Sequence, residues 1–268
     1  MDVVYNMKRE MLRRKLSPRT VKTYLFWVNK FLLANRDKLP KEFSKKDIRE
    51  FLYKVEEKDV SGSTLNVAHN ALRFMMIDVL HKACYLKIKY AKVPVRKVEY
   101  LTREEVKRIL DVINNDKHKL LVSLMYGAGL RVREVVRLKT NDFEFDQDIG
   151  FVRNGKGSKD RAFIIPQKIK QELIESCKKE KFWLFPGRNG ALTTKAVQQI
   201  VKKAGIKAKI KKHIHPHMLR HSFTTHLFES GVDITSVQNL LGHSRPDTTL
   251  IYSHFSKPKM FNIKSPLD

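Results

Sequence analysis

The sequence predicts a mainly helical chain that carries one small antiparallel β-sheet in its second half. Apolar residues recur at helical spacing over most of the 268 residues, whereas short strand-like runs gather in one stretch. Hydrophobic residues make up 42% of the chain, enough for a buried core and too many for wholesale disorder. The length suggests one large domain or two ordinary ones.

The first ninety residues are expected to form helices only. Ser17 and Pro18 make a favourable helix start, because serine can cap a helix and proline fits its first turn. Ser44 and Asp47 have the spacing of a capping box, with a shorter acid than usual. No catalytic constellation is visible here, so we interpret this part as a compact helical module with cations on its outer faces.

A short linker is expected before a second domain. The segment AKVPVRKV contains a proline and three cations and shows no helical stripe. Thr102 and Glu105 then form a second capping box, which begins a new helix. We therefore place a first domain at 1–92, the linker at 93–98 and a second domain at 99–268.

The small sheet is expected in the middle of the second domain, with helices resuming near residues 167 and 194 and from Pro216. Short strands bracketed by helices indicate a mixed α+β domain rather than a parallel sheet. The predicted strands, and the turn between the last two, are 143–145, 149–154 and 161–165, with the turn at 155–159.

The net charge is the most unusual bulk property. Lysine and arginine total 54 against 28 aspartate and glutamate, which gives +26 and a pI near 10.0. So basic a chain repels itself, and the usual reason is a polyanionic partner. Because the cations run from end to end rather than along one amphipathic helix, nucleic acid is favoured over a membrane surface.

The two cysteines, Cys84 and Cys177, lie far apart and lack metal-type spacing. They argue against a disulfide scaffold and against a cysteine-based zinc site. No secretory signal is visible, and the longest apolar region, 120–130, is too short to span a bilayer. We therefore expect a cytoplasmic protein without a membrane partner.

The first of four chemically suggestive patterns is YGAGLRVRE, residues 126–134. Its glycines are expected to end one helix, with Arg131 at the start of the next, where a guanidinium suits a phosphate. Glu134 lies three residues on and can hold that guanidinium in place. Alone, the pattern fits equally well an ordinary helical corner with a surface ion pair.

The second pattern is the predicted hairpin tip GKGSKDR, residues 155–161. Lys156, flanked by glycines, can enter a DNA groove or donate a proton to a departing oxygen. A solvated basic turn is the commoner explanation of such a segment. It is not a phosphate-binding P-loop, because the required ending and the strand-to-helix setting are absent.

The third pattern is HPHMLRH, residues 215–221, at the start of a predicted helix. His217 and Arg220 lie off the apolar stripe of this helix and can point the same way. His217 and His221 have the spacing of a zinc pair, but the glutamate of a metalloprotease and any thiolate are missing. Metal binding is disfavoured, and His221 and His226 are expected to pack or hydrogen-bond.

The fourth pattern joins LLGHS, residues 240–244, to TTLIYSH, residues 248–254. Gly242 can end a helix and leave His243 at the corner, and Tyr252 follows nine residues later. A tyrosine at helical spacing is more often a core residue than a nucleophile. Nothing local distinguishes this one among the eight tyrosines.

Together the four patterns supply the residue types that phosphoryl transfer to a tyrosine needs. Two arginines can clamp the charge that grows on the phosphate oxygens. The tyrosine hydroxyl, with an ordinary pKa of about 10, must lose its proton, and a histidine can accept it. A lysine can protonate the leaving sugar oxygen. Neither a metal nor a nucleotide cofactor is required.

The same strings resemble those of tyrosine recombinases of the Xer and phage-integrase type. GAGLRVREVVRL, GKGSKDR, HPHMLRHSFTTHL and LLGHSRPDTTLIYSH follow the order and spacing of that family from about residue 99 to about 255. Four such strings in order are highly specific. SPRTVKTYLFWVNKFL gives a looser match to the family's helical core-DNA-binding domain. The length and layout are most similar to the short archaeal Xer proteins.

The resemblance implies a fold, an N-terminal helical bundle followed by an α+β catalytic domain, and roles for the residues that hold the phosphate. Arg131 and Arg220 would grip the scissile phosphate, and Glu134 would support the site. Lys156, on its hairpin, would be the general acid.

It also implies the parts of the covalent step. Tyr252 would be the nucleophile, leaving a 3′-phosphotyrosine and a free 5′-hydroxyl. His217 would be its acid–base partner, and His243 would hydrogen-bond a phosphate oxygen. The energy of the broken bond would stay in the phosphotyrosine, so no cofactor and no ATP are expected.

The family acts as a tetramer on double-stranded DNA with paired inverted half-sites, and each C-terminal segment docks on a neighbour. Only 16 residues follow Tyr252, among them Pro258 and Pro266, so the docking is expected to be short or weak. Resolution of chromosome or plasmid dimers is the expected role, and integration of a mobile element is the alternative.

Basic residues away from the site are expected to let both domains grip the duplex. Neutralising about 6 to 10 phosphates would cost ~10³ to ~10⁵ in affinity between about 50 and 200 mM salt. The basic run from Lys8 to Lys15, ahead of the first clear helix, belongs to this surface. The expected DNA contacts of the second domain are Lys159, Arg161, Lys202, Lys203, Lys211 and Lys212.

Three other function classes remain open. A DNA-binding protein with the same fold and no chemistry would have lost at least one member of the residue set. A type IB topoisomerase would relax supercoiled DNA of any sequence as a monomer. A metal-dependent nuclease would lose its activity in EDTA.

Overall fold

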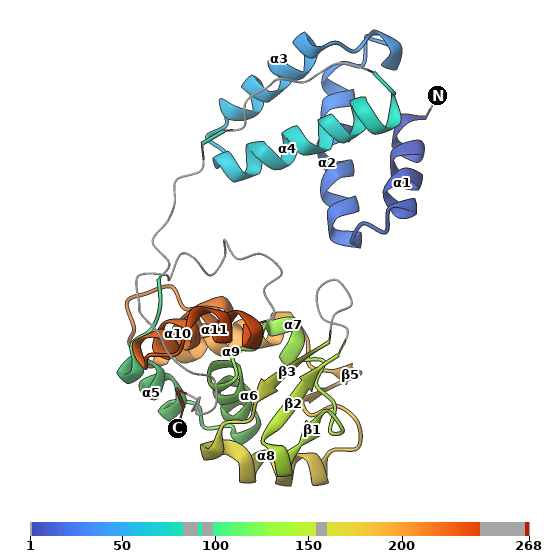
Figure 1. Cartoon of the computed structure of the whole chain (residues 1–268). Helices are drawn as coiled ribbons and strands as arrows, with labels where there is room; N and C mark the ends of the chain where they lie inside the picture. The colour runs from blue at the N-terminus through green and yellow to red at the C-terminus, as the bar shows by residue number, and fades with distance from the viewer. Residues whose placement is uncertain (1, 83–90, 93–98, 154–159, 242–265, 268) are drawn as a thin grey trace. The chain divides into compact units, whose positions relative to one another are not determined.

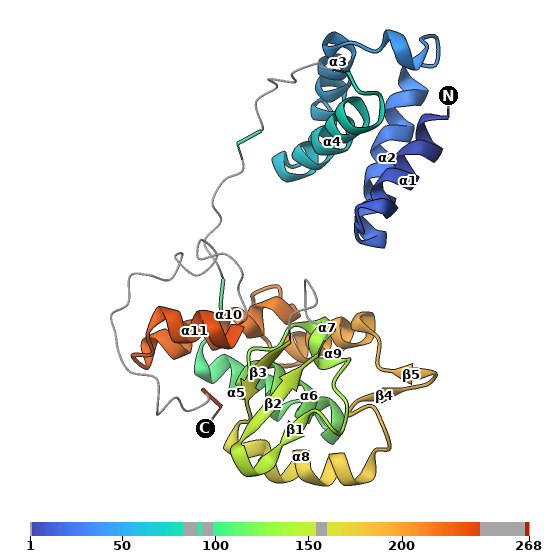
Figure 2. The ribbon, with the colours of Figure 1, turned by 45° about the vertical axis from the view of Figure 1, so that its right-hand side comes forward.

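The computed structural model divides into two compact units, Met1–Arg96 and Lys97–Asp268 (Figures 1 and 2). Each unit has its own hydrophobic core. The prediction of a mainly helical chain with a small antiparallel sheet in its second half is confirmed. The residues that the structure describes are 2–82, 91–92, 99–153, 160–241 and 266–267.

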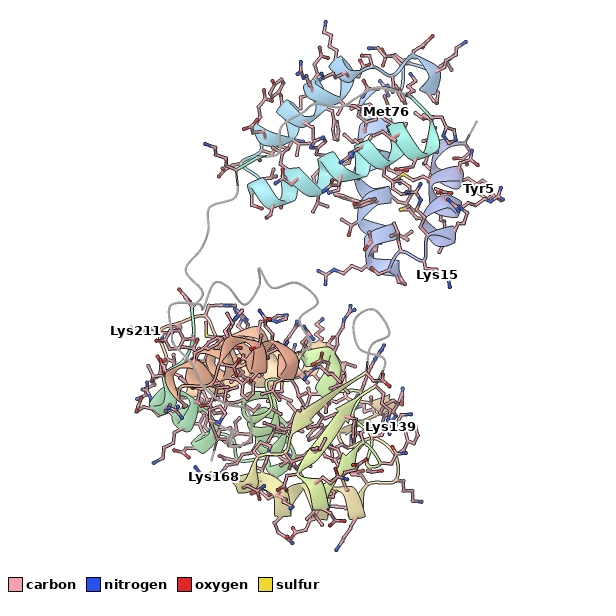
Figure 3. All side chains as sticks on the ribbon, viewed as in Figure 1. Tyr5, Lys15, Met76, Lys139, Lys168 and Lys211 are labelled. Carbon is pink, nitrogen blue, oxygen red and sulfur yellow. The ribbon has the colours of Figure 1, made fainter. Side chains whose placement is uncertain are left out.

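The described part of the first unit consists of helices. Their apolar faces meet in one core, in which the ring of Phe31 contacts Phe43 and Phe51 edge to face, with centroids 5.1 and 5.5 Å apart. Tyr5 lies at the outer surface, whereas Met76 is fully buried (Figure 3). The elements are α1 (Val3–Arg13), α2 (Pro18–Ala34), the 3₁₀ turn η1 (Pro40–Glu42), α3 (Lys45–Glu56), α4 (Gly62–Phe74) and the π-helix η2 (Met75–Val79).

The helix starts of this unit follow the predicted caps. The hydroxyl of Ser17 accepts the backbone N–H of Thr20, and Pro18 is the first residue of α2. The N–H of Ser44 donates to the Asp47 carboxylate at 2.7 Å, which confirms the capping box at α3. Each cap satisfies a backbone group that the helix cannot bond itself.

The basic run from Lys8 to Lys15 was expected ahead of the first helix, and this prediction is wrong, because most of the run lies in α1. Glu10 accepts hydrogen bonds from Arg13 and Arg14, and Arg14 also donates to Asp78 at 2.6 Å. Acidic neighbours within the unit therefore offset part of the positive charge of these arginines.

The second unit combines helices with a three-stranded antiparallel sheet of order β1-β2-β3. Val152 pairs with Arg161 at the end of the sheet from which segment 154–159 departs. The helices are α5 (Arg103–Asp111), α6 (Asp116–Gly127), α7 (Val132–Val135), α8 (Gln167–Lys179), α9 (Thr194–Lys207), α10 (Pro216–Glu229) and α11 (Ile234–Leu241). The strands are β1 (Phe143–Glu144), β2 (Ile149–Val152), β3 (Arg161–Ile164), β4 (Pro186–Gly187) and β5 (Gly190–Ala191), and η3 (Phe145–Gln147) is a 3₁₀ turn.

The predicted strands exist but are shorter than expected. Phe145 begins the turn η3 instead of extending β1, because its backbone leaves the sheet there. The small hairpin of β4 and β5 was missed, since strands of two residues carry no period-two pattern. The predicted turn at 155–159 lies outside the described residues.

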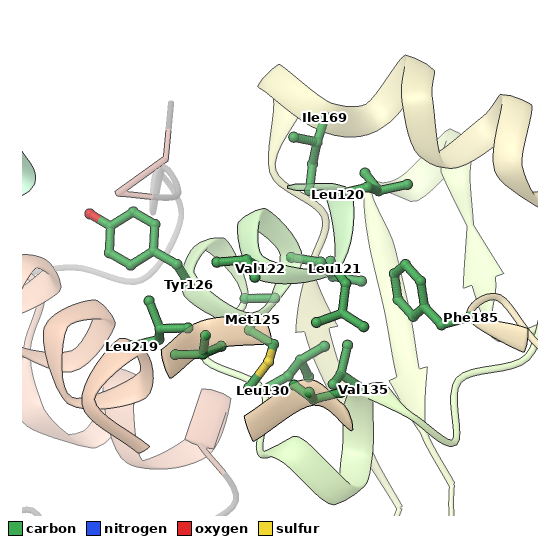
Figure 4. Packing of buried hydrophobic residues seen from close by; sticks show 14 of the residues in the cluster. Leu120, Leu121, Val122, Met125, Tyr126, Leu130, Val135, Ile169, Phe185 and Leu219 are labelled. Atoms are coloured by element: carbon green, nitrogen blue, oxygen red, sulfur yellow. The ribbon is translucent and has the colours of Figure 1, made fainter. Parts of the chain in front are cut away.

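Helix α6 is the centre of the second core. Leu120, Leu121, Val122 and Met125 all point into apolar surroundings, and Figure 4 shows α8 and α10 residues packed around them. A helix buried on all sides carries an apolar run without a polar face. The longest apolar stretch of the sequence is therefore a core helix, and none of the helices described is long and apolar enough to cross a membrane.

Candidate active site

Only some residues of the four predicted patterns lie in the part of the chain that the structure describes. Arg131 and Glu134 lie at the corner between α6 and α7, and His217 and Arg220 lie on α10. From the same patterns, Arg161 begins β3, whereas four predicted site residues fall outside the part of the chain that the structure describes: Lys156, Lys159, His243 and Tyr252.

The corner between α6 and α7 depends on Gly129. Its φ of +59° is a conformation that side chains rarely adopt, and a Cβ atom here would lie 2.4 Å from the ring of Phe223 on α10. Glycine is needed for both reasons. The corner thus brings Arg131, the residue before α7, close to α10.

The buried carboxylate of Glu134 is the point where the arginines of the site meet. Its Oε1 accepts Arg131 Nη1 at 2.6 Å, and its Oε2 accepts the backbone N–H of Arg131 at 2.8 Å. Arg161 Nη2 donates to Oε2 at 2.7 Å, and Arg220 Nη1 lies 3.8 Å from the same atom. The prediction that Glu134 holds the Arg131 guanidinium is confirmed.

Glu134 is ionised in this setting. Burial alone would raise its pKa, but the charge of Arg161, the N–H of Arg131 and the charge of Arg220 together lower the pKa to about 2. One negative charge therefore faces three guanidinium groups. The surplus of positive charge suits an added anion such as a phosphate.

Arg220 is held between two backbone carbonyls. Its Nη1 donates to the carbonyl of Gly129 at 2.5 Å, and its Nη2 donates to that of Leu241 at 2.6 Å. The sequence placed Arg220 off the apolar stripe of its helix. The structure instead buries nearly the whole of α10, and the Arg220 side chain is only 7% exposed, because other helices cover that face.

Arg161 also points inward. It is the first residue of β3, its side chain is 10% exposed, and its Nη1 donates to the carbonyl of Leu240 at 2.5 Å while Nη2 bonds Glu134. Burial lowers the pKa of Arg161, and the charge of Glu134 opposes that shift. The prediction that Arg161 contacts DNA does not fit this geometry, because both ends of its guanidinium are bonded within the unit.

His217 is an exposed residue in the first turn of α10. Partial desolvation, followed by the neighbouring His215, Arg220 and Arg131, lowers its pKa. Burial likewise lowers the pKa of His221, to about 4. Both rings are therefore neutral near pH 7, and a neutral imidazole can accept a proton.

The histidine-rich segment does not gather into a metal-type cluster in the part of the chain described. The rings of His213 and His215 lie 6.4 Å apart, and those of His215 and His217 lie 6.5 Å apart. No group of three or more histidine, cysteine, aspartate or glutamate side chains among the described residues is placed to hold a metal ion.

The predicted basic contacts of the second unit divide into two kinds. Lys202 and Lys203 on α9 are exposed, as is Lys211 (Figure 3). Lys212 instead donates to the Glu105 carboxylate at 2.6 Å and to the carbonyl of Tyr100 at 2.9 Å. The Lys212 ammonium group thus secures the start of α5, and its contact with DNA stays a prediction.

Comparisons with known proteins decide the family. The model of the phage integrase family matches residues 99–258, a range that contains all four sequence patterns. The model of the N-terminal SAM-like domain of phage integrases matches residues 4–84. The chain belongs to the phage integrase family.

Its relatives are named tyrosine recombinases. XerA of Thermococcus kodakarensis is 38% identical over 247 residues, which cover 88% of this chain and 85% of the relative. XerA of Pyrococcus furiosus is 36% identical over 255 residues, covering 88% and 84%. We therefore describe the chain as a tyrosine site-specific recombinase.

Solved structures agree with this assignment. A XerA recombinase crystal structure is 28% identical, with a TM-score of 0.55, and the match covers 95% of this chain and 94% of the other. A XerH recombinase bound to palindromic difH substrate is 26% identical, with a TM-score of 0.72, covering 91% and 78%.

Arg161, like Arg220, is an inward arginine that the sequence patterns did not identify as such. Arg161 and Phe163 lie two residues apart on β3, and residues at that spacing share a face of a strand. Phe163 is buried. This alternation was the available signal that Arg161 faces the interior rather than solvent.

Proposed function

We propose that the recombinase cuts and rejoins double-stranded DNA through a covalent 3′-phosphotyrosine at Tyr252. The convergence of Arg131 and Arg220 on the buried Glu134 carries this proposal. A guanidinium group from the residue before α7 and one from α10 are brought to one place, and Arg161 adds a third positive charge. A phosphodiester, with one negative charge that shifts onto its free oxygens during attack, is the group that such a site binds best.

The remaining roles follow from the chemistry of one displacement. The Tyr252 hydroxyl loses its proton to His217 and forms a bond to phosphorus as the bond from phosphorus to the 5′ oxygen breaks. Lys156 donates a proton to that 5′ oxygen, and His243 hydrogen-bonds a phosphate oxygen. The neutral state of His217 near pH 7 supports its part as acceptor. Rejoining is the same exchange in reverse, so no ATP is consumed and no metal is needed.

The partner is proposed to be a DNA site with paired inverted half-sites, bound by a tetramer of the recombinase in the cytoplasm. The palindromic substrate of the XerH neighbour supports the inverted arrangement. The proposed role is resolution of chromosome or plasmid dimers, and with it chromosome segregation, which fits the Xer-type likeness of the chain; integration of a mobile element is the alternative.

A plasmid assay tests this function. Binding sites selected by the protein from random duplex DNA are placed twice on a supercoiled plasmid, in direct or inverted order. We expect deletion between direct copies and inversion between inverted copies, in EDTA and without ATP. Relaxation of any supercoiled plasmid without exchange would contradict the proposal and favour a topoisomerase.

A further inference from the structure

The end of α11 is secured by two buried arginines. Here Arg161 bonds the carbonyl of Leu240 at 2.5 Å, and Arg220 bonds that of Leu241 at 2.6 Å. Both arginines also face Glu134. A closed set of contacts thus joins α11, α10 and the α6–α7 corner, and the sequence reaches His243 two residues beyond Leu241.

Arg161 connects this set to the strand that follows the predicted lysine hairpin. It is the first residue of β3, directly after Asp160 and segment 154–159. Directly after the neighbouring strand β2, Arg153 Nε donates to the buried carboxylate of Asp142 at 2.8 Å. An arginine paired with a carboxylate therefore anchors each strand end next to this segment. Of these two arginines, Arg161 is the one that bonds residues of α7 and α11.

Arg161 also affects how closely Glu134 can interact with Arg220. The Oε2 atom of Glu134 already accepts Arg161 at 2.7 Å and the N–H of Arg131 at 2.8 Å. Arg220 stays 3.8 Å from that atom and is bonded to carbonyls instead. Because these two hydrogen bonds of Arg220 go to neutral carbonyls, Glu134 offsets its charge only over the longer 3.8 Å separation.

We propose that Arg161 is a positioning residue of the recombinase, which holds Glu134 and the end of α11 so that Arg131 and Arg220 face the scissile phosphate as charged groups. This inference rests on the roles of Arg131 and Arg220 in the proposed function. It replaces the DNA contact expected of Arg161 with a role exerted through its neighbours inside the protein.

Two substitutions separate these roles. Arg161→Lys keeps the charge but loses the planar fork that reaches two acceptors, and Arg161→Gln removes the charge as well. DNA affinity is measured over a range of salt, and single-turnover cleavage of a nicked duplex is measured at saturating protein. Lys168→Ala, on the exposed surface of α8, is the neutral control, and Lys202→Ala is the control for an exposed DNA contact.

A positioning role predicts that cleavage at saturation falls by about 10- to 100-fold in both variants, because small misplacements of catalytic groups are costly. The slope of log affinity against log salt should stay at the wild-type value. The opposite result, a slope reduced by about 0.9 with unchanged cleavage at saturation, would mean that Arg161 neutralises a DNA phosphate and would overturn the inference.

A double-mutant cycle with Glu134→Gln tests whether Arg161 acts through Glu134. If it does, adding Arg161→Gln to Glu134→Gln costs much less in cleavage rate than adding it to wild type. Equal losses in the two backgrounds contradict the inference. Thermal unfolding checks that each variant is folded. If Arg161→Gln is not folded, Arg161→Lys alone decides, through its cleavage rate and its salt slope.

The wild-type reaction separates this inference from the proposed function. A wild-type protein that forms no covalent complex contradicts both. Wild-type cleavage with unchanged cleavage in both Arg161 variants contradicts the positioning role only.

Discussion

The guanidinium of Arg220 donates a hydrogen bond to the carbonyl of Leu241 at 2.6 Å and thereby ties α10 to the last residue of α11. The other end of the same guanidinium bonds Gly129 at the α6–α7 corner. One side chain therefore joins α10, α11 and the α6–α7 corner, and its loss is expected to affect both folding and catalysis.

Arg220→Lys is expected to slow single-turnover cleavage by about 10² to 10³, the usual effect of losing one preorganised donor to a transition-state oxygen. Two buried carbonyls also lose a partner, so the free energy of unfolding should fall by about 1 to 3 kcal/mol. Cleavage is followed on a nicked duplex at saturating protein, and stability by urea unfolding. An unchanged cleavage rate would remove Arg220 from the chemistry.

The low pKa of Glu134 makes stability depend on pH. Its folded pKa of about 2 lies below its ordinary value of 4.5, so the stabilisation is fully present above about pH 4.5 and is lost as the pH falls toward 2. The shift corresponds to about 3 kcal/mol. Urea unfolding of wild type and Glu134→Gln between about pH 7 and 3 should give curves that converge in acid. Curves that stay parallel would show that Glu134 is not the group responsible.

The exposed lysines near the histidine segment are expected to contact DNA phosphates. Replacing Lys202, Lys203 and Lys211 with alanine should weaken binding and reduce the salt slope by about 0.9 for each phosphate that is no longer neutralised. Lys168→Ala is the matched control, since Lys168 is also exposed but lies on α8, away from Lys211 (Figure 3). If Lys168→Ala weakened binding as much as replacement of a test lysine, the net charge of the protein, and not the position of these lysines, would determine DNA affinity.

The buried pair of Tyr126 and His226 is expected to stabilise the second unit. The Tyr126 hydroxyl lies 2.8 Å from His226 Nδ1 and donates to the carbonyl of Pro266 at 3.2 Å, and burial raises the pKa of Tyr126 to about 12. Tyr126→Phe should lower the free energy of unfolding by about 1 to 2 kcal/mol. The exposed Tyr5→Phe serves as the comparison, and equal stabilities of the two variants would argue against this hydrogen bond.

Helix starts were predictable because their causes are local. Ser17, Ser44 and Thr102 each cap a helix through a residue three positions on, and that spacing is visible in the sequence. The pairing of Arg131 with Glu134 was predictable for the same reason.

The inward cations were not predictable in the same way, because their partners are remote in sequence. Arg161 bonds residues 27 and 79 positions away, and Lys212 bonds a carboxylate 107 positions away. Composition and motif order reveal that many cations are present. Only the fold decides which of them meet a buried acceptor and which remain on the surface.

The central claim is tested most directly by trapping the covalent intermediate. Wild type and Tyr252→Phe are each incubated in EDTA with a nicked duplex whose cleaved fragment diffuses away, and the products are separated on a denaturing gel. We predict a shifted protein–DNA band with wild type only. The absence of that band from wild type, on DNA that it binds in a mobility-shift control, would contradict the enzymatic function, and a band that persists in Tyr252→Phe would show that another residue is the nucleophile.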